Sequence, residues 1–240
     1  MAKDNLYSGL AGICTKFYDL SIDAKRAADF IDSRINKFGL KDILFIGGFF
    51  LVAKELVDKG YNVTVADYTD EMVDEGKKRL PKTRIVKADI RKLPFNQEFD
   101  AVLVIGRVFT HMLSNEDVND ALLGIRKSLK PKGILFFDNY EDNKIMKTSY
   151  FNKRVQAKKG NIKIIRDSST ELISKKPFIV NWKATYIVTE NNKSREFNDE
   201  MAHRAFSRQE IKELLEINGF KQLENGNNFD ETSFYAIAQK

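Results

Sequence analysis

Strand-like and helix-like segments alternate along the first 138 residues of this 240-residue chain, and this order restricts the fold more than any other feature. Apolar or β-branched runs are separated by segments with apolar residues at helical spacing. The runs are 42–46, 62–66, 84–88, 99–105 and 133–138. Continuous apolar runs of this length are typical of strands buried on both faces of a parallel sheet. The sequence therefore predicts an α/β fold with a doubly wound, mostly parallel sheet and right-handed crossovers.

The alternation stops between residues 140 and 206. Segments 162–165, 178–188 and 195–197 resemble antiparallel strands. A capping box at Ser207–Glu210 then begins a helix that Gly219 ends, and strands are expected at 220–224 and 234–238. We interpret residues 1–240 as one domain whose sheet has seven strands and which carries a β-rich insertion at 141–206.

Cysteine usage and hydropathy narrow the class of protein. Cys14 is the single cysteine, so an intramolecular disulfide is excluded. Residues 1–10 lack the apolar core of a secretion signal. The longest uncharged apolar run, 43–53, has 11 residues, whereas a bilayer span needs roughly 20. We expect a cytoplasmic protein without a membrane partner.

Ligands of open α/β sheets bind beyond the carboxyl ends of the strands, which directs attention to the residues that follow each strand. Asp67 ends the second strand, and a carboxylate there can accept hydrogen bonds from ribose hydroxyls; its alternative is a solvated cap of the next helix. Asp89 ends the third strand. It can accept from an adenine amino group while the N–H of Ile90 meets a ring nitrogen, or it can form an ordinary Asx turn.

Several pieces of this order resemble the class I S-adenosylmethionine-dependent methyltransferases. They are Gly60-Tyr-Asn-Val-Thr-Val-Ala-Asp67, Ala88-Asp-Ile-Arg-Lys-Leu-Pro94, Phe99–Ile105 and Leu129–Leu135. The insertion after the fifth strand, the Tyr18-Asp19 pair and Thr110-His-Met-Leu113 are most similar to sugar N,N-dimethyltransferases and glycine N-methyltransferase-like enzymes. The resemblance implies a Rossmann-like methyltransferase fold and S-adenosylmethionine as cofactor.

The resemblance also implies roles for individual residues. Tyr18 would close over the cofactor, and His111 would act near the acceptor as a group that can take a proton. Tyr68 or Met72 would pack on adenine. The cofactor would be held by Gly47, Gly48, Asp67, Asp89, Ile90 and Ile105.

Four further side chains keep two interpretations each. His111 can hydrogen-bond backbone instead, and His203 is interpreted as structural. Arg107 pairs either with an acidic acceptor or with a nearby carboxylate. Trp182 is interpreted as core or pocket wall. With two histidines and one cysteine, no metal site is predicted.

The first loop departs from the family pattern of an acidic residue followed by spaced glycines. Phe45 stands where the acid is expected, and Phe49 and Phe50 stand near the later glycines. One hypothesis is a working methyltransferase with a divergent loop, favoured by the two carboxylates. A second is a methyltransferase-like binding or partner subunit that has lost the cofactor. A third is an RNA methyltransferase, favoured by the positive charge, although no Asn-Pro-Pro-Tyr motif follows the fourth strand.

The net charge of +6 lies entirely in the insertion, where residues 141–206 hold 14 Lys plus Arg and 8 Asp plus Glu. The insertion is expected to cover the acceptor side of the site. This favours an acidic or phosphate-bearing acceptor, the alternative being a solvated lysine-rich face at 144–176. We expect a methyltransferase of a small polar acceptor, methylated at nitrogen. Nucleic acid is the less favoured partner, and the oligomeric state is open.

Overall fold

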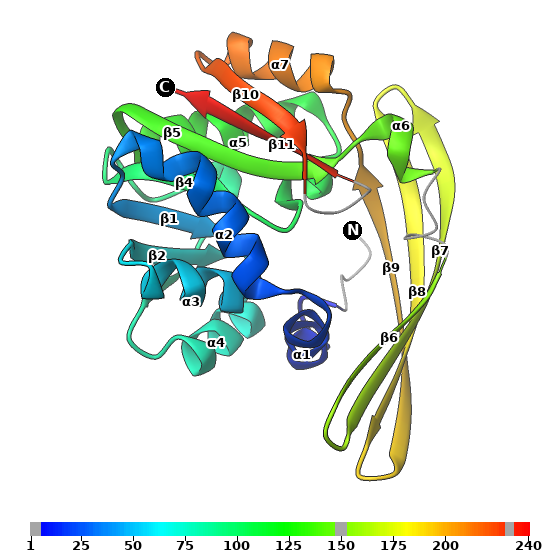
Figure 1. The fold of residues 1–240 in the computed structure, drawn as a ribbon. Coiled ribbons are helices and arrows are strands. Elements are labelled where there is room, and N and C mark those ends of the chain that lie inside the picture. Colours follow the sequence, from blue (N-terminus) through cyan, green and yellow to red (C-terminus); the bar gives the residue numbers. More distant parts are fainter. Residues whose placement is uncertain (1–5, 147–152, 229–232) are drawn as a thin grey trace.

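A seven-stranded sheet forms the centre of the protein, in the order β10-β11-β5-β4-β1-β2-β3 (Figure 1). The computed structural model describes residues 6–146, 153–228 and 233–240. Strands β1 to β5 pair in parallel, and β11 joins β5 antiparallel, so the predicted fold class is confirmed. The strands are β1 Asp42–Ile46, β2 Asn62–Asp67, β3 Arg84–Lys87, β4 Phe99–Val104, β5 Leu129–Tyr140, β10 Lys221–Asn227 and β11 Ser233–Gln239.

Helices cover both faces of this sheet because its strands are apolar on both sides. One buried cluster lies under α2, α3 and α4, and the other lies under α5 and α7. The N-terminal α1 packs beside α4 at the edge of the sheet. The helices are α1 Ala11–Ser21, α2 Ala24–Ile35, α3 Phe50–Asp58, α4 Asp70–Arg79, α5 Asn115–Ser128, α6 Asp142–Ile145 and α7 Arg208–Ile217, with 3-10 turns η1 Asn36–Phe38, η2 Ile90–Lys92 and η3 Val108–His111.

Local chemistry sets where several of these helices begin. The side chains of Thr69, Ser114 and Ser207 accept hydrogen bonds from the first turns of α4, α5 and α7, as the capping box at Ser207–Glu210 predicts for α7. The apolar spacing over residues 21–38 also predicts a helix, and the α-helix that the structure shows there is shorter at both ends. Asp23 caps a helix that starts at Ala24, and the end of the segment tightens into η1.

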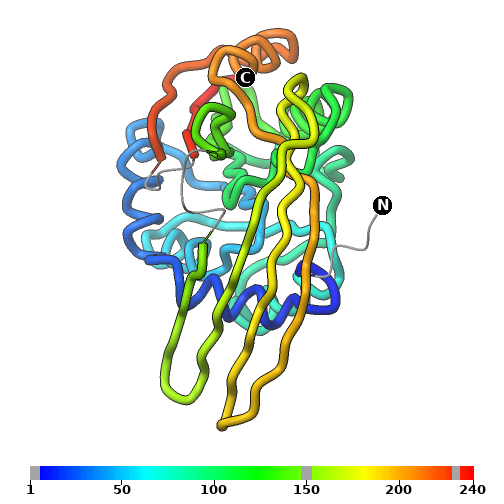
Figure 2. The backbone as a smooth tube through the Cα atoms, turned by 90° about the vertical axis from the view of Figure 1, so that its right-hand side faces the viewer, coloured from blue at the N-terminus to red at the C-terminus, as the bar shows by residue number. Residues whose placement is uncertain are grey.

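The segment after β5 forms a second, antiparallel sheet in the order β6-β7-β8-β9. Its long hairpins run beside α1 and project beyond the α/β body (Figures 1 and 2). The predicted strands are present but longer, and β6 was not predicted. The strands are β6 Arg154–Lys159, β7 Ile162–Lys175, β8 Phe178–Glu190 and β9 Lys193–Arg204. None of the helices in the described ranges has the length and apolarity that a membrane crossing requires.

The second sheet is joined to the first at the end of β9. The carbonyl of Arg204 accepts hydrogen bonds from the Thr110 hydroxyl (2.9 Å) and the Asn139 amide (3.3 Å). The Phe206 N–H donates to the Tyr140 carbonyl (3.0 Å). The Arg204 side chain is completely buried and pairs with Glu210 at 2.7 Å. These bonds fix the second sheet over the carboxyl ends of β4 and β5.

Gly47 marks the closest backbone approach in the sheet. It follows β1 with a φ of +126°, and a Cβ built on it would lie 2.2 Å from the Ile105 carbonyl oxygen. A side chain would therefore push apart the loops that follow β1 and β4. The sequence shows only a pair of glycines here. The structure shows that a residue with a side chain would be strained at Gly47 and would clash with Ile105.

We expect Gly47→Ala to lower the free energy of unfolding by about 2–4 kcal/mol, because it adds a steric clash to an unfavourable φ. Denaturant unfolding followed by circular dichroism measures the change. Gly9→Ala is the matched control, since a Cβ there meets nothing within 4 Å. Equal unfolding midpoints for the two variants would contradict this interpretation.

Candidate functional site

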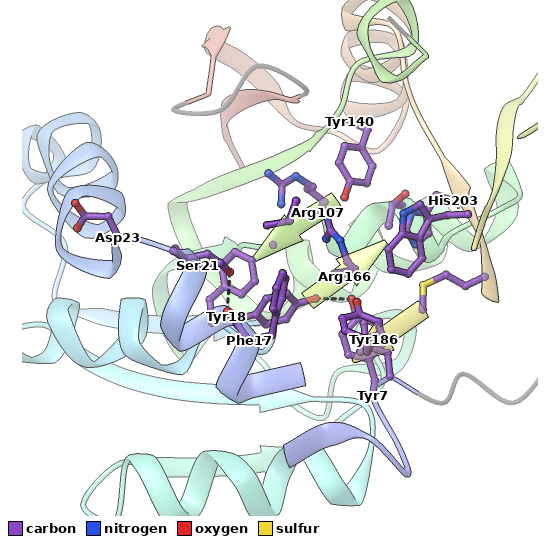
Figure 3. Close-up of a pocket in the computed structure, with 18 of the residues that line it drawn as sticks. Tyr7, Phe17, Tyr18, Ser21, Asp23, Arg107, Tyr140, Arg166, Tyr186 and His203 are labelled. Atoms are coloured by element: carbon purple, nitrogen blue, oxygen red, sulfur yellow. Dashed lines mark hydrogen bonds between the residues drawn. The ribbon is translucent and has the colours of Figure 1, made fainter. Parts of the chain in front are cut away.

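A cavity of about 330 Å³ lies between the carboxyl edge of the central sheet, α1 and the second sheet (Figure 3). This volume is in the range of small-molecule sites. Its wall is largely aromatic and includes several arginines. The lining residues are Leu6, Tyr7, Phe17, Tyr18, Ser21, Ile22, Asp23, Arg26, Phe49, Gly106, Arg107, Thr110, Tyr140, Val155, Arg166, Trp182, Tyr186, Met201 and His203.

The second sheet contributes its inward face to this cavity. Side chains of a strand alternate between the two faces, so every second residue of β8 and β9 points the same way. Trp182 and Tyr186 line the cavity from β8, and Met201 and His203 line it from β9. Arg166 of β7 stands directly opposite Tyr186. The second sheet is therefore the roof of this cavity. That the insertion covers an acceptor stays a prediction.

The loop after β4 forms the opposite wall and is held by one buried carboxylate. Asp138 accepts hydrogen bonds from the backbone N–H groups of Gly106 (2.9 Å) and Arg107 (3.0 Å). Its other oxygen accepts from the Asn228 amide at 3.0 Å. Arg107 adopts a left-handed conformation, with φ +65°, which is uncommon for a residue with a side chain. The carboxylate thus keeps a strained loop, and the Arg107 side chain, at the cavity.

Two arginines at the cavity are buried, Arg107 at 8% and Arg166 at 6% exposure. The Arg107 guanidinium lies 5.1 Å from the ring centre of Tyr140. The Arg166 guanidinium lies 5.4 Å from the ring centre of Phe17 and 5.7 Å from that of Trp182. A guanidinium packed on an aromatic ring is attracted to the negative face of that ring. The cavity therefore combines apolar walls with positive charge.

The surface charge of the second sheet is a separate feature. Among the described basic residues of 141–206, only Arg166 and Arg204 are buried. Most of the lysines of this segment are exposed to solvent, which is the alternative that the sequence left open for 144–176. The positive charge that faces the cavity thus comes from its arginines and not from the lysine-rich surface.

Tyr18 lies at the base of the cavity. Its hydroxyl is 3.1 Å from that of Tyr7, and its ring meets the Phe49 ring edge-on at 4.8 Å (Figure 3). Burial raises the pKa of Tyr18 well above its ordinary value, so the phenol is neutral. The backbone of Tyr7 is tied to the end of β2, because its carbonyl accepts from the Thr69 hydroxyl at 2.7 Å. The N-terminal segment thus bridges the cavity and the β2 edge.

The two histidines form a ring pair at the wall. The rings of His111 and His203 meet edge-on at 5.7 Å, and His111 also meets Tyr7 edge-on at 5.5 Å. Burial lowers the pKa of His111 to about 4. The described lining residues include His203 but not His111, which lies behind it. His111, the histidine that the resemblance places near the acceptor, is thus not among the lining residues and contacts His203, which is.

The carboxyl end of β2 carries a carboxylate with an uncommitted oxygen. Asp67 Oδ1 accepts from the N–H groups of Tyr68 (2.7 Å) and Thr69 (3.4 Å), whereas its Oδ2 accepts from no described residue. Burial raises the pKa of Asp67 to about 6. A Cβ built on Gly48 would lie 3.9 Å from Oδ2 and 2.3 Å from the Met72 methyl carbon. The absent side chain at Gly48 leaves the backbone close to this carboxylate.

The other residues that the resemblance implied for the cofactor occupy different environments. Tyr68 is 62% exposed beside Asp67, whereas Met72 is completely buried under Gly48. Asp89 already forms a bidentate pair with the Arg91 guanidinium and caps η2. Ile90 and Ile105 are buried in the two faces of the core, and the Ile105 carbonyl is the group that approaches Gly47. Their roles toward a cofactor stay predictions.

The three phenylalanines of the divergent loop are separated by the fold. Phe45 lies in the core on β1, and Phe50 lies in the core against Gly76. Phe49 alone lines the cavity, with its ring against the Cα of Gly106. A Cβ on Gly106 would lie 3.3 Å from that ring. The substitution of glycine by phenylalanine at this point therefore shapes the cavity wall.

The sequence did not identify Arg166, Tyr140, Tyr186 or the cavity position of His203 as site residues. The period-two pattern of Val180, Trp182, Ala184, Tyr186 and Val188 does indicate one apolar face. Which partner that face covers depends on how the second sheet docks. That docking involves backbone hydrogen bonds that leave no pattern in the sequence.

Comparison with known proteins agrees with this arrangement. A protein-family model described as "Methyltransferase domain" matches residues 47–137. Glycine/sarcosine N-methyltransferase of Halorhodospira halochloris is 32% identical over 129 residues, which cover 49% of this chain and 47% of that protein. The enzyme of the same name from Parasynechococcus marenigrum is 27% identical over 61% of this chain and 54% of that protein. The chain thus matches about half the length of these relatives.

Solved structures resemble the whole chain. A S-adenosylmethionine-dependent methyltransferase from Clostridium acetobutylicum has a TM-score of 0.78 at 19% identity, covering 98% of this chain and 99% of that one. An amino pentose methyltransferase from Micromonospora echinaspora has a TM-score of 0.76 at 16% identity, covering 96% and 95%. These likenesses include the second sheet and show a shared fold. Residues 47–137 thus match a methyltransferase domain, and the whole chain shares the fold of these S-adenosylmethionine-dependent methyltransferases of known structure.

Proposed function

We propose that the protein is a S-adenosylmethionine-dependent N-methyltransferase whose small acceptor carries an anionic group. The observation that supports it most is the roofed cavity, in which Arg107 and Arg166 are buried against aromatic rings. A buried guanidinium is well suited to hold a carboxylate or phosphate through two parallel hydrogen bonds. The relatives named glycine/sarcosine and amino pentose methyltransferases support a nitrogen acceptor.

The residues at the end of β2 fit the nucleoside part of the cofactor. A ribose offers two hydroxyl donors, and Asp67 Oδ2 is an acceptor that no described residue uses. Gly47 and Gly48 have no side chains, so the cofactor could pass close to the backbone of this loop. The exposed Tyr68 ring could cover the adenine. Asp89 would meet the adenine edge, and Ile90 and Ile105 would border the site.

The chain's own groups then define the acceptor side. When bound, S-adenosylmethionine supplies a methyl group on a positively charged sulfur, which an uncharged amine can attack with its lone pair. Tyr18 and Phe49 would border both ligands, since they line the cavity next to Gly106. The apolar walls exclude water, and the positive charge of Arg107 and Arg166 disfavours a protonated amine. His111, which the resemblance placed near the acceptor, would act from behind His203.

The hypothesis of a partner subunit without cofactor and the hypothesis of an RNA methyltransferase are less well supported. Phe49 lines the cavity wall, whereas Asp67 and Gly48 lie outside the lining and are partly exposed. A roofed cavity of about 330 Å³ suits a small molecule better than a polynucleotide. Cofactor binding separates the first alternative from the proposal.

We expect S-adenosylhomocysteine to bind, with Asp67→Ala weakening the affinity about tenfold because a partner of two hydroxyls is lost. Isothermal titration calorimetry measures both affinities. The folded carboxyl keeps its proton up to about pH 6, and only the ionised form accepts from both hydroxyls. Binding should therefore be about tenfold weaker near pH 5 than near pH 7.

Asp67→Asn is the matched control for this pH dependence, because it cannot ionise and should give a flat profile. Absence of binding at millimolar ligand would refute the cofactor role. An unchanged affinity of Asp67→Ala would refute the assignment of the ribose site.

We expect Arg166→Gln to raise the KM of an anionic acceptor about 10- to 100-fold, because a charged hydrogen bond is lost in a buried site. The assay follows formation of S-adenosylhomocysteine with glycine, sarcosine and a nucleoside-diphosphate amino sugar. Glycinamide serves as the uncharged comparison. Arg195→Gln, on the exposed part of the same sheet, is the control and should behave as the unaltered protein. Equal use of glycine and glycinamide, with no effect of Arg166→Gln, would contradict the anionic acceptor.

A further inference from the structure

His203 is a buried histidine whose polar atoms lack partners. It is 6% exposed, and neither ring nitrogen forms a hydrogen bond with any described residue. A buried imidazole without hydrogen bonds is costly, since both nitrogens lose water and gain nothing in return. The ring borders the cavity together with Tyr140, Arg107 and Arg166 (Figure 3). Such a group is placed to bond with a ligand that enters the cavity.

The ring lies nearly parallel to two neighbouring aromatic side chains. His203 stacks on Trp182 with 14° between the ring planes and 5.6 Å between the centres, and on Tyr140 with 23° and 5.8 Å. Trp182 is its diagonal neighbour across β8 and β9, because Val180 stands opposite His203. The stacked faces leave the ring edge, which carries the nitrogens, as the part that meets a ligand.

The backbone beside His203 is fixed as well. The next residue, Arg204, carries the carbonyl that binds Thr110 and Asn139, and its side chain is buried. The position of the imidazole therefore does not depend on an exposed loop. A rigidly placed polar group is what orientation of a reacting atom requires.

We propose that His203 is the acceptor-contacting histidine of this site, and that one of its ring nitrogens accepts a hydrogen bond from the N–H of the amine to be methylated. This rests on the proposed function and deepens it. Acceptance of an N–H directs the nitrogen lone pair away from His203, where it can form the new N–C bond as the C–S bond of the cofactor breaks. The positive charge of Arg107 and Arg166, and not this hydrogen bond, disfavours the ammonium, which is also an N–H donor. The proton of the ammonium goes to solvent before the amine enters the cavity.

The groups that surround His203 keep it neutral. Burial is the main cause that lowers its pKa well below 6.5, and the charges of His111 and Arg107 lower it further. Tyr140 and Trp182 cover its faces, and Arg166 lies beyond Trp182. No described carboxylate is among the groups that set its pKa. One nitrogen of a neutral imidazole accepts a hydrogen bond, whereas neither nitrogen of the protonated ring can.

The first test is nuclear magnetic resonance on protein with labelled histidine in the S-adenosylhomocysteine complex. The chain has two histidines, so two ring signals are expected, assigned with His111→Phe and His203→Phe. Because burial lowers the pKa of His203 well below its ordinary value, its signal should stay that of a neutral ring at pH values below the ordinary pKa of histidine. Titration of His203 at its ordinary pKa would overturn the inference, and this readout needs no turnover.

The second test is kinetic, with whichever of glycine, sarcosine or the amino sugar nucleotide the unaltered protein methylates. His203→Phe keeps a stacked ring without nitrogens, and should lower kcat/KM about 10- to 100-fold while the affinity for S-adenosylhomocysteine stays within twofold. His203→Gln, which can still accept a hydrogen bond, should recover part of the loss. Glu200→Gln, exposed on the same strand, is the control.

The outcomes separate this inference from the proposed function. If the unaltered protein does not bind S-adenosylhomocysteine, the proposed function fails, and the resonance test without cofactor still reports whether His203 is neutral. If the protein is active and His203→Phe retains its kcat/KM, the inference fails alone. If His203→Phe and His203→Gln lose activity and cofactor affinity equally, His203 is structural and the inference is wrong.

Discussion

The hydrogen bonds at the end of β9 are the interaction on which the site depends. The Arg204 carbonyl binds a hydroxyl from η3 and an amide from β5, and the Phe206 N–H binds the Tyr140 carbonyl. These bonds fix the position of the second sheet over the central sheet. Without a fixed position, the space between the two sheets would not have a defined shape. The junction also sets the place of His203, one residue away. The Arg204 guanidinium at this junction is buried, and an unpaired charge there would be costly, so its pair with Glu210 ties the end of β9 to α7.

The chemistry that the cavity supports follows from what its wall excludes. Aromatic rings and buried arginines provide few places for water, and they disfavour positive charge on a bound amine. The nitrogen that receives the methyl group needs a lone pair. A site that prefers the uncharged amine therefore favours the reactive form of the acceptor. The same arginines suit an anionic group elsewhere on the acceptor. Under the proposed function, one electrostatic arrangement would serve both the binding of the acceptor and the selection of its uncharged amine.

The parallel strands of the central sheet could be predicted because each is an apolar or β-branched run between helical segments. The starts of α5 and α7 are also marked in the sequence, by the N-cap residues Ser114 and Ser207. The candidate residues Asp67 and Gly47 were likewise predictable from their place after a strand. His203 was not, because its role depends on the diagonal pairing of β9 with Trp182 and on the docking of a whole sheet. Met72 is the opposite case, because the resemblance implied that it packs on adenine. In the structure it is completely buried under Gly48, where the missing side chain of the glycine leaves room for it.

We propose that the carboxyl edge of β2 at Asp67 and the roofed cavity at His203 are two halves of one site. A crystal structure of the protein with S-adenosylhomocysteine and an amine acceptor would test this arrangement. We expect the ribose hydroxyls to lie on Asp67, the sulfur to face the cavity beside Gly106, and the acceptor nitrogen to lie within hydrogen-bond distance of His203. A cofactor bound with its sulfur away from the cavity, or an acceptor held outside the roof, would contradict it.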